Sequence, residues 1–144
     1  MEDYKKETKR TFIIFTFAFV ANLVWENLHS RLYLAYGGGP ITEIILWLAS
    51  FWDAVIIVVI FLPFLHFNFL KSKPWIIFVL GVAISLAIEW YALATNRWAY
   101  GPLMPIIPFL GTGLTPTLQL GLLGYLAYKF EKYASARWFV ILEK

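Results

Sequence analysis

The chain has 144 residues, of which 60% are hydrophobic and 15% are charged, and its formal net charge is +3. Because soluble domains carry about 25% charged residues, much of the surface of this protein is expected not to face water. The sequence has no cysteine, which excludes disulfides, thiol chemistry and thiolate metal sites. It also lacks the basic stripe that is typical of nucleic-acid binding.

Four segments are apolar over the roughly 20 residues that a helix needs to cross a bilayer. The first two cover about residues 11–34 and 43–67, and a glycine-rich turn joins them. The third covers 74–95 and begins at Pro74, a residue favoured at the first position of a helix. The fourth and shortest covers about 115–131. We therefore predict an all-α integral membrane protein, a single domain over residues 1–144 built as an up-down bundle of four transmembrane helices.

The connection between the third and fourth segments, residues 96–115, differs from an ordinary linker. It is rich in proline and glycine, yet most of its other side chains are apolar. An apolar loop is a poor solvated linker, and open backbone at membrane depth has to be buried against protein. We therefore expect this loop to fold back over the bundle as a cap or a re-entrant segment.

Positive charges indicate the orientation of the bundle. The two connections that are rich in glycine and proline hold only Arg31 and Arg97, whereas the chain ends and the second loop are basic. By the positive-inside rule, both termini are expected to be cytoplasmic in a multi-pass protein of the cell membrane. The cations on that side are Lys5, Lys6, Lys9, Arg10, Lys71, Lys73, Lys129, Lys132, Arg137 and Lys144.

Each predicted span carries one strongly polar side chain: Glu26, Asp53, Glu89 or Gln119. A charged side chain within a span is costly, and such residues commonly mark functional sites. At a rise of 1.5 Å per residue, all four fall in the outer half of the membrane, where we expect them to line one pocket beneath the third loop. The alternative is a hydrogen-bonded network that only locks the bundle, with Arg97 or Arg31 neutralising a carboxylate.

Neighbouring residues extend this candidate site. Asn22 and His29 lie four residues before and three residues after Glu26, and therefore on the same helical face. Trp25, Trp52 and Trp90 each adjoin a carboxylate and could hold a polyene or a cationic intermediate, although core packing explains them equally well. We assign catalysis to Glu26, Asp53 and Glu89. The assigned substrate-binding residues are Asn22, Trp25, His29, Trp52, Trp90, Asn96, Arg97, Trp98, Tyr100 and Gln119.

A metal site is the alternative for the same residues. Glu26 and His29 have the Glu-x-x-His spacing of di-iron helix bundles, but those bundles need two such motifs and this chain has one. A single ion could be held by Glu26, His29, Asp53 and Glu89. We expect no cofactor.

Several short phrases carry a resemblance to known families. They are Trp25-Glu26, Trp52-Asp53, Glu89-Trp90-Tyr91-Ala92, Arg97-Trp98-Ala99-Tyr100 and Gly113-Leu114-Thr115-Pro116.

Over most of its length the chain resembles small uncharacterised bacterial four-span membrane proteins. It is distantly similar to the lycopene cyclase domain of the heterodimeric type, in which an acidic span is followed by a Trp-x-Tyr loop and a Pro-x-Glu-Glu-like helix start. Glu89 and Trp98-Ala99-Tyr100 match the first two elements, whereas Pro116-Thr117-Leu118-Gln119 lacks the acids of the third. The layout also resembles the emopamil-binding-protein (EXPERA) group.

The resemblance and the buried carboxyls together favour an enzyme that acts on an apolar isoprenoid, carotenoid or sterol-like lipid. Glu26 or Glu89 would act as a general acid, and Asp53 would take a proton back or stabilise a carbocation, in an isomerisation or cyclisation. The alternatives are a proton- or cation-coupled transporter or channel, and a subunit that binds a lipid or a pigment. The expected partners are the lipid bilayer and a hydrophobic small molecule, with no nucleic acid, and a homo-oligomer is left open.

Overall fold

The computed structural model describes residues 2–142 of the chain, and it is almost entirely helical. A two-stranded antiparallel ribbon is the only sheet among these residues. The elements in chain order are α1 (Glu2–His29), η1 (Ser30–Leu32, a 3-10 turn), β1 (Tyr33–Tyr36), α2 (Glu43–His66), α3 (Asn68–Lys71), α4 (Trp75–Ala94), β2 (Trp98–Tyr100) and α5 (Leu114–Leu142).

Three of the described helical segments are long and apolar enough to cross a membrane: Tyr4–Leu32, Glu43–His66 and Trp75–Ala94. The fourth long helix, α5, packs against α1 and α4. Many large apolar side chains on the outside of the helices are exposed, as expected where lipid replaces water. The chain is therefore a multi-pass membrane protein built as a helical bundle.

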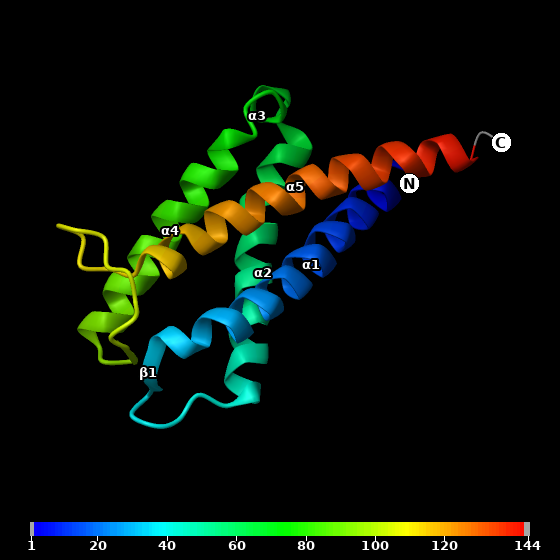
Figure 1. Ribbon diagram of the computed structural model, residues 1–144. Coiled ribbons are helices and arrows are strands. Elements are labelled where there is room, and N and C mark those ends of the chain that lie inside the picture. The colour runs from blue at the N-terminus through cyan, green and yellow to red at the C-terminus, as the bar shows by residue number, and fades with distance from the viewer. Residues whose placement is uncertain (1, 143–144) are drawn as a thin grey trace.

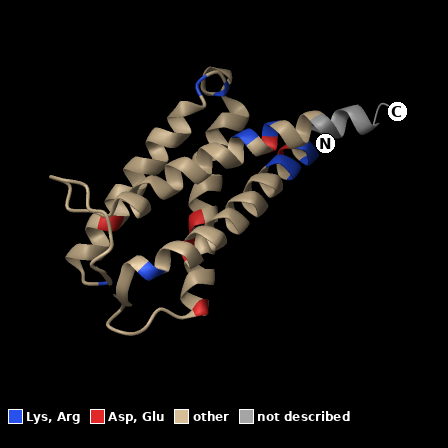
Figure 2. Ribbon diagram, in the orientation of Figure 1, with Lys and Arg blue, Asp and Glu red and all other residues tan. Residues whose placement is uncertain are grey.

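The two ends of the bundle differ, because consecutive long helices run in opposite directions (Figure 1). The chain ends and α3 lie at one end, and β1 and β2 lie at the other, which we call the ribbon end. Most Lys and Arg residues gather near the chain ends and α3 (Figure 2). Between residues 11 and 70 and between 74 and 128, the only Lys or Arg residues are Arg31 and Arg97.

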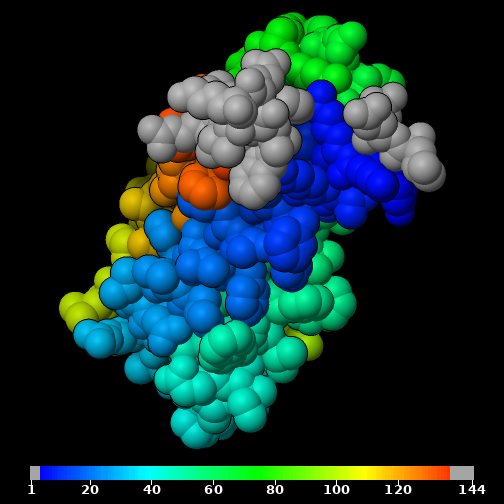
Figure 3. All heavy atoms as spheres, turned by 90° about the vertical axis from the view of Figure 1, so that its right-hand side faces the viewer, coloured from blue at the N-terminus to red at the C-terminus, as the bar shows by residue number. Residues whose placement is uncertain are grey.

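The hydrophobic core fills the half of the bundle away from the ribbon. Phe61 and Phe64 of α2 both place their rings 6.0 Å from the ring of Tyr128 on α5, in edge-on contacts. Next to this core, Arg10 donates to the two carboxylate oxygens of Glu131 at 2.7 and 3.0 Å, which ties α1 to α5. The α1 and α2 helices also pack side by side, and their atoms form one continuous surface in the space-filling view (Figure 3).

Several elements differ from the sequence-based prediction. Helix α5 continues to Leu142, well beyond residue 131, because no glycine or proline interrupts residues 125–142. Helix α1 begins at Glu2, before the predicted span, and ends at His29, so that Tyr33 and Leu34 belong to a strand. The ribbon itself was not predicted, because each of its strands is only three or four residues long.

The loop between β2 and α5 also differs from its prediction. Its base is buried at Met104 and Thr112, but Leu103 and Phe109 are exposed, and Figure 1 shows the loop projecting away from the helices. The expected fold-back over the bundle is therefore found at the base of the loop and is wrong for its tip.

Helices α4 and α5 approach so closely that two glycines face each other. A Cβ atom added to Gly81 would lie 2.5 Å from the Cα of Gly121, and one added to Gly121 would lie 2.5 Å from the backbone oxygen of Phe78. Both distances are too short for any real contact, so the backbone separation leaves no room for a side chain. Small residues are the common device by which membrane helices pack at close range.

Replacing Gly81 by alanine is therefore expected to destabilise the bundle by about 1–3 kcal/mol, the usual cost of overpacking a tight interface. The matched control is Ala83→Val on the exposed face of the same helix, which should change stability by less than about 0.5 kcal/mol. Unfolding in mixed micelles by titration with SDS, followed by circular dichroism, measures both. Equal stability of the two variants would contradict the close approach.

Candidate functional site

The ribbon brings four aromatic side chains to one end of the bundle. Tyr33 pairs with Tyr100 and Tyr36 pairs with Trp98, with an irregularity between the two pairs. The ring of Tyr36 stacks on that of Trp98 at 6.1 Å, and the ring of Tyr33 lies 5.5 Å from that of Tyr100. The backbone of Gly101 donates to Leu32 at 2.6 Å and extends the ribbon. Two loops that are far apart in the sequence thus form one aromatic rim.

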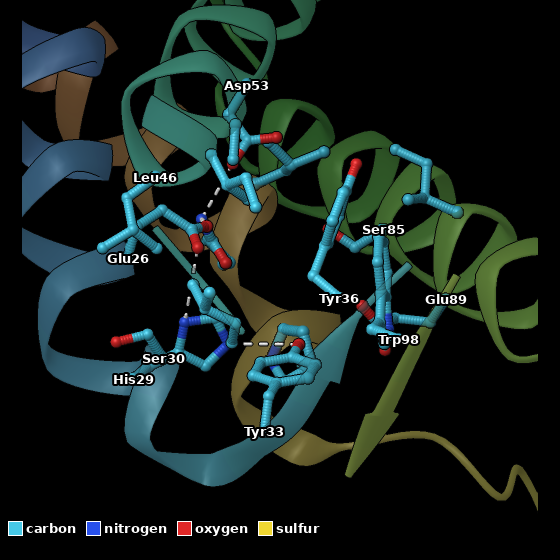
Figure 4. A pocket seen from close by; sticks show the side chains of 17 residues that line it. Glu26, His29, Ser30, Tyr33, Tyr36, Leu46, Asp53, Ser85, Glu89 and Trp98 are labelled. Atoms are coloured by element: carbon cyan, nitrogen blue, oxygen red, sulfur yellow. Dashed lines mark hydrogen bonds and ion pairs between the residues drawn. The ribbon is translucent and has the colours of Figure 1, made fainter. Parts of the chain in front are cut away.

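A cavity of about 120 Å³ lies beneath this rim, between α1, α2, α4 and α5. All three predicted catalytic carboxyls and Gln119 line it, as do the predicted residues His29 and Trp98. Figure 4 shows Glu26 and His29 on one side of the cavity and Glu89 with Trp98 on the other. The lining contains no Lys or Arg. Its other members are Ser30, Tyr33, Tyr36, Ile41, Ile45, Leu46, Ala49, Ser85, Ile88, Pro116 and Leu120.

Gln119 joins the polar groups of α1 and α2. Its Nε2 lies 2.6 Å from Glu26 Oε1 and 2.9 Å from Asp53 Oδ2. It also lies 3.0 Å from Asn22 Oδ1, and Asn22 in turn donates to the backbone oxygen of Ala18 at 2.8 Å. Gln119 thus bridges the Glu26 carboxyl of α1 and the Asp53 carboxyl of α2. This cluster of Asn22, Glu26, Asp53 and Gln119 is named the amide cluster.

His29 connects the amide cluster to the rim. The Tyr33 hydroxyl lies 3.3 Å from Nε2 of His29, and Nδ1 of His29 faces Glu26 Oε2 at 3.8 Å. Burial raises the pKa of Tyr33, so its phenol stays protonated and can donate to Nε2. Nδ1 of His29 has no hydrogen-bond partner among the described residues.

Glu89 lies on the opposite wall of the cavity and is bound by side chains outside the amide cluster. The Tyr100 hydroxyl donates to its Oε2, and the Trp98 indole donates to the same oxygen at 3.4 Å. The backbone N–H of Gly113 donates to the Tyr100 oxygen at 2.8 Å and fixes the phenol in place. Burial raises the pKa of Tyr100, and its bond to Glu89 adds to the shift, so Tyr100 remains a donor at neutral pH.

Other residues assigned to substrate binding lie away from the cavity. Trp52 is 60% exposed on the outside of α2, and Trp90 is 49% exposed and donates to the backbone oxygen of Leu110. Asn96 is exposed in a left-handed turn with φ of 53°. Trp25 packs against the hydrophobic core. A tryptophan next to a carboxylate in the sequence points about 100° away from it around the helix, which explains why Trp25, Trp52 and Trp90 do not line the cavity beside the carboxyls.

Arg97 does not neutralise a carboxylate. It is exposed, and its guanidinium lies 6.0 Å from the ring centre of Tyr91. Among the described side chains, neither Arg97 nor Arg31 forms an ion pair. The metal alternative is not supported either, because the described residues contain no group of three or more His, Asp or Glu side chains placed to hold an ion.

Tyr33, Tyr36 and Ser85 also line the cavity, although they are not among the residues assigned to the site from the sequence. The alternation of aromatic and small residues in Trp98–Tyr100 and the aromatic residues at both ends of Tyr33–Tyr36 were a weak signal for the two strands. Ser85 precedes Glu89 by one helical turn, and its hydroxyl is buried without a hydrogen-bond partner.

Replacing Gln119 by leucine should cost about 1–3 kcal/mol, because it removes a donor from buried carboxyls. Adding Asp53→Asn to that variant places a new amide beside Glu26 and is expected to recover part of the loss. SDS titration in micelles measures both, and Leu122→Val, at an exposed position of the same helix, is the control. A Gln119→Leu variant as stable as the parent protein would show that the amide cluster does not hold α1, α2 and α5 together.

Comparison of the chain with models of protein families, with curated proteins and with solved structures finds no match. The interpretation of the cavity therefore depends on its own geometry.

Proposed function

We propose that the protein is a membrane-embedded enzyme that isomerises or cyclises an apolar isoprenoid, carotenoid or sterol-like lipid by acid–base chemistry between carboxyl groups. One observation carries the proposal. Three carboxyl side chains, Glu26, Asp53 and Glu89, line a cavity that has no cationic side chain in its wall.

Glu131 provides a comparison within the same bundle. It is fully buried in α5, and it is paired with Arg10 through two hydrogen bonds. A carboxylate whose role is structural is thus neutralised by a cation in this protein. The three carboxyls of the cavity have no such partner, although burying unpaired carboxyls is costly. Selection for chemistry at this cavity accounts for them better than selection for stability.

The two walls of the cavity suit the two halves of a proton transfer. Glu26 or Asp53, in its protonated form, would protonate one carbon of a double bond. Glu89, which accepts two hydrogen bonds, would remove a proton from a neighbouring carbon of the resulting carbocation. The double bond then shifts with no net gain or loss of atoms, and water or a proton relay resets the carboxyls. The aromatic rim would stabilise the cationic intermediate through the faces of its rings.

The size of the cavity limits how the substrate binds. At about 120 Å³ it is smaller than the 300–1,000 Å³ or so of pockets that enclose a whole ligand. One end of the lipid would enter the cavity, and the remainder would stay in the bilayer. By the positive-inside rule, the ribbon end faces the outer leaflet and both termini are cytoplasmic, so the substrate would enter from that leaflet.

The packing in the half of the bundle away from the ribbon favours an enzyme over a transporter or a channel. Beyond the carboxyls, the described interior is filled by apolar side chains such as Ile57, Phe61 and Ile14, each at most 1% exposed. Conduction needs polar or hydrated steps on both sides of a site, and this apolar core lies between the cavity and the Arg10–Glu131 pair.

Deuterium exchange tests the proposal directly. The purified protein is reconstituted in liposomes with extracted membrane lipids in D₂O, and the lipids are analysed by mass spectrometry. An enzyme that protonates a double bond introduces carbon-bound deuterium. Glu89→Gln and Glu26→Gln should each lower the rate by about 10²–10⁴-fold, the usual contribution of a general acid or base.

Glu43→Gln is the matched control, since Glu43 is an exposed carboxylate at the start of α2. This variant should keep the full rate. Exchange by Glu89→Gln at the parental rate would rule out the mechanism. A lipid that co-purifies but never exchanges would instead assign the protein to the class of lipid-binding subunits.

A further inference from the structure

The loop between β2 and α5 contains an ordered hairpin rather than a loose linker. Its backbone bonds run from the N–H of Ile107 to the oxygen of Thr112 at 2.8 Å and from the N–H of Leu114 to the oxygen of Pro105 at 2.7 Å. Ile106 also pairs with Gly113 as an isolated bridge. We call residues 103–113 the apolar hairpin. Its shape is set by its own hydrogen bonds, so the side chains at its tip have a defined direction.

The apolar hairpin presents large apolar side chains to its surroundings, from its first residue to its tip. Leu103 is 78% exposed, Ile106 is 47% exposed, and Phe109 is fully exposed. Phe109 also has a φ of 69°, a left-handed conformation that is unfavourable for a bulky residue. Facing water, this arrangement would combine backbone strain with exposed hydrophobic surface.

The charge pattern excludes an ordinary solvated loop. From Trp98 to Tyr128 the sequence has no Asp, Glu, Lys or Arg, and this stretch includes the whole apolar hairpin. Exposed apolar patches that lack charged residues mark membrane or partner surfaces.

The position of the apolar hairpin indicates that its exposed side chains contact the membrane rather than a protein partner. Trp90, on the exposed face of the membrane-spanning helix α4, donates its indole N–H to the backbone oxygen of Leu110 at 3.0 Å. Tryptophans at the ends of spans lie at the membrane–water interface, and Trp90 is one turn from the end of α4. The tip therefore continues the lipid-facing surface of α4, and Figure 1 shows the loop extending outward from this part of the bundle.

We propose that the apolar hairpin inserts its tip into the boundary between lipid headgroups and acyl chains, in the leaflet at the ribbon end. Interfacial elements of this kind reach about 5–10 Å into that boundary. The insertion would place Leu103, Ile106 and Phe109 among acyl chains. This proposal does not depend on the proposed enzymatic function.

Insertion would also act on the cavity. The base of the apolar hairpin supplies the Gly113 N–H that fixes the Tyr100 phenol, and that phenol donates to Glu89. The bilayer would thus hold one wall of the cavity at a set depth in the leaflet.

The absence of cysteine from the sequence allows a direct test. Phe109→Cys and, as a second position, Leu103→Cys each introduce one thiol into the full chain for labelling with the fluorophore NBD. The labelled proteins are reconstituted in phosphatidylcholine liposomes. Quenching is measured with aqueous iodide and with lipids that carry a nitroxide near the headgroup. Thr42→Cys, exposed in the first loop at the same end of the bundle, is the matched control.

We expect a blue-shifted emission at positions 103 and 109, several-fold weaker quenching by iodide than at position 42, and strong quenching by the shallow nitroxide lipid. Iodide quenching equal to that at position 42 would place the tip in water and overturn the proposal. Protection from iodide without quenching by nitroxide lipid would also overturn it, because the tip would then be covered by protein, such as a second copy of the chain.

Discussion

The arrangement of the bundle depends on a single primary amide. Gln119 of α5 reaches Glu26 and Asn22 of α1 and Asp53 of α2 from one nitrogen atom. In a medium without water, a buried carboxyl has to find its partners within the protein, so these three helices can pack in few other ways without leaving a polar group unsatisfied. Away from the cavity, the core of the bundle consists of apolar side chains. The amide cluster therefore fixes the relative positions of three helices where the cavity forms.

Helix α4 is held by different means, and this difference gives the cavity its two walls. It packs on α5 through Gly81 and Gly121, and its carboxyl at Glu89 is bound by Tyr100 from the ribbon. The ribbon joins the first and third loops, so the connections between the helices are part of the site. Two carboxyl systems with separate hydrogen-bond partners can differ in protonation, which is the property that acid–base chemistry requires.

Carboxylates in this bundle fall into two kinds according to their partners. Glu131 accepts two hydrogen bonds from the Arg10 guanidinium beside the hydrophobic core. This pair links α1 and α5. Glu26, Asp53 and Glu89 have neutral partners and line a cavity. A neutral partner satisfies hydrogen bonds without fixing the charge of the carboxyl, so the group stays free to exchange a proton. Under the proposed function, the same side-chain chemistry serves structure at one end and reactivity at the other.

The sequence alone was sufficient for features that depend on one helix at a time. Hydrophobicity over 20 or so residues predicts a span, and helical rise predicts depth, so Glu26, Asp53, Glu89 and Gln119 could be expected in one layer. The tertiary structure decided which neighbours of these residues face the cavity, because a side chain's direction depends on how its helix is rotated in the bundle. Trp52 and Trp90 therefore face outward, while Tyr33 and Tyr36 reach the cavity through the pairing of two strands that are more than 60 residues apart in the chain. Strands this short have no sequence signal strong enough to reveal their partner, and only the folded bundle brings them together.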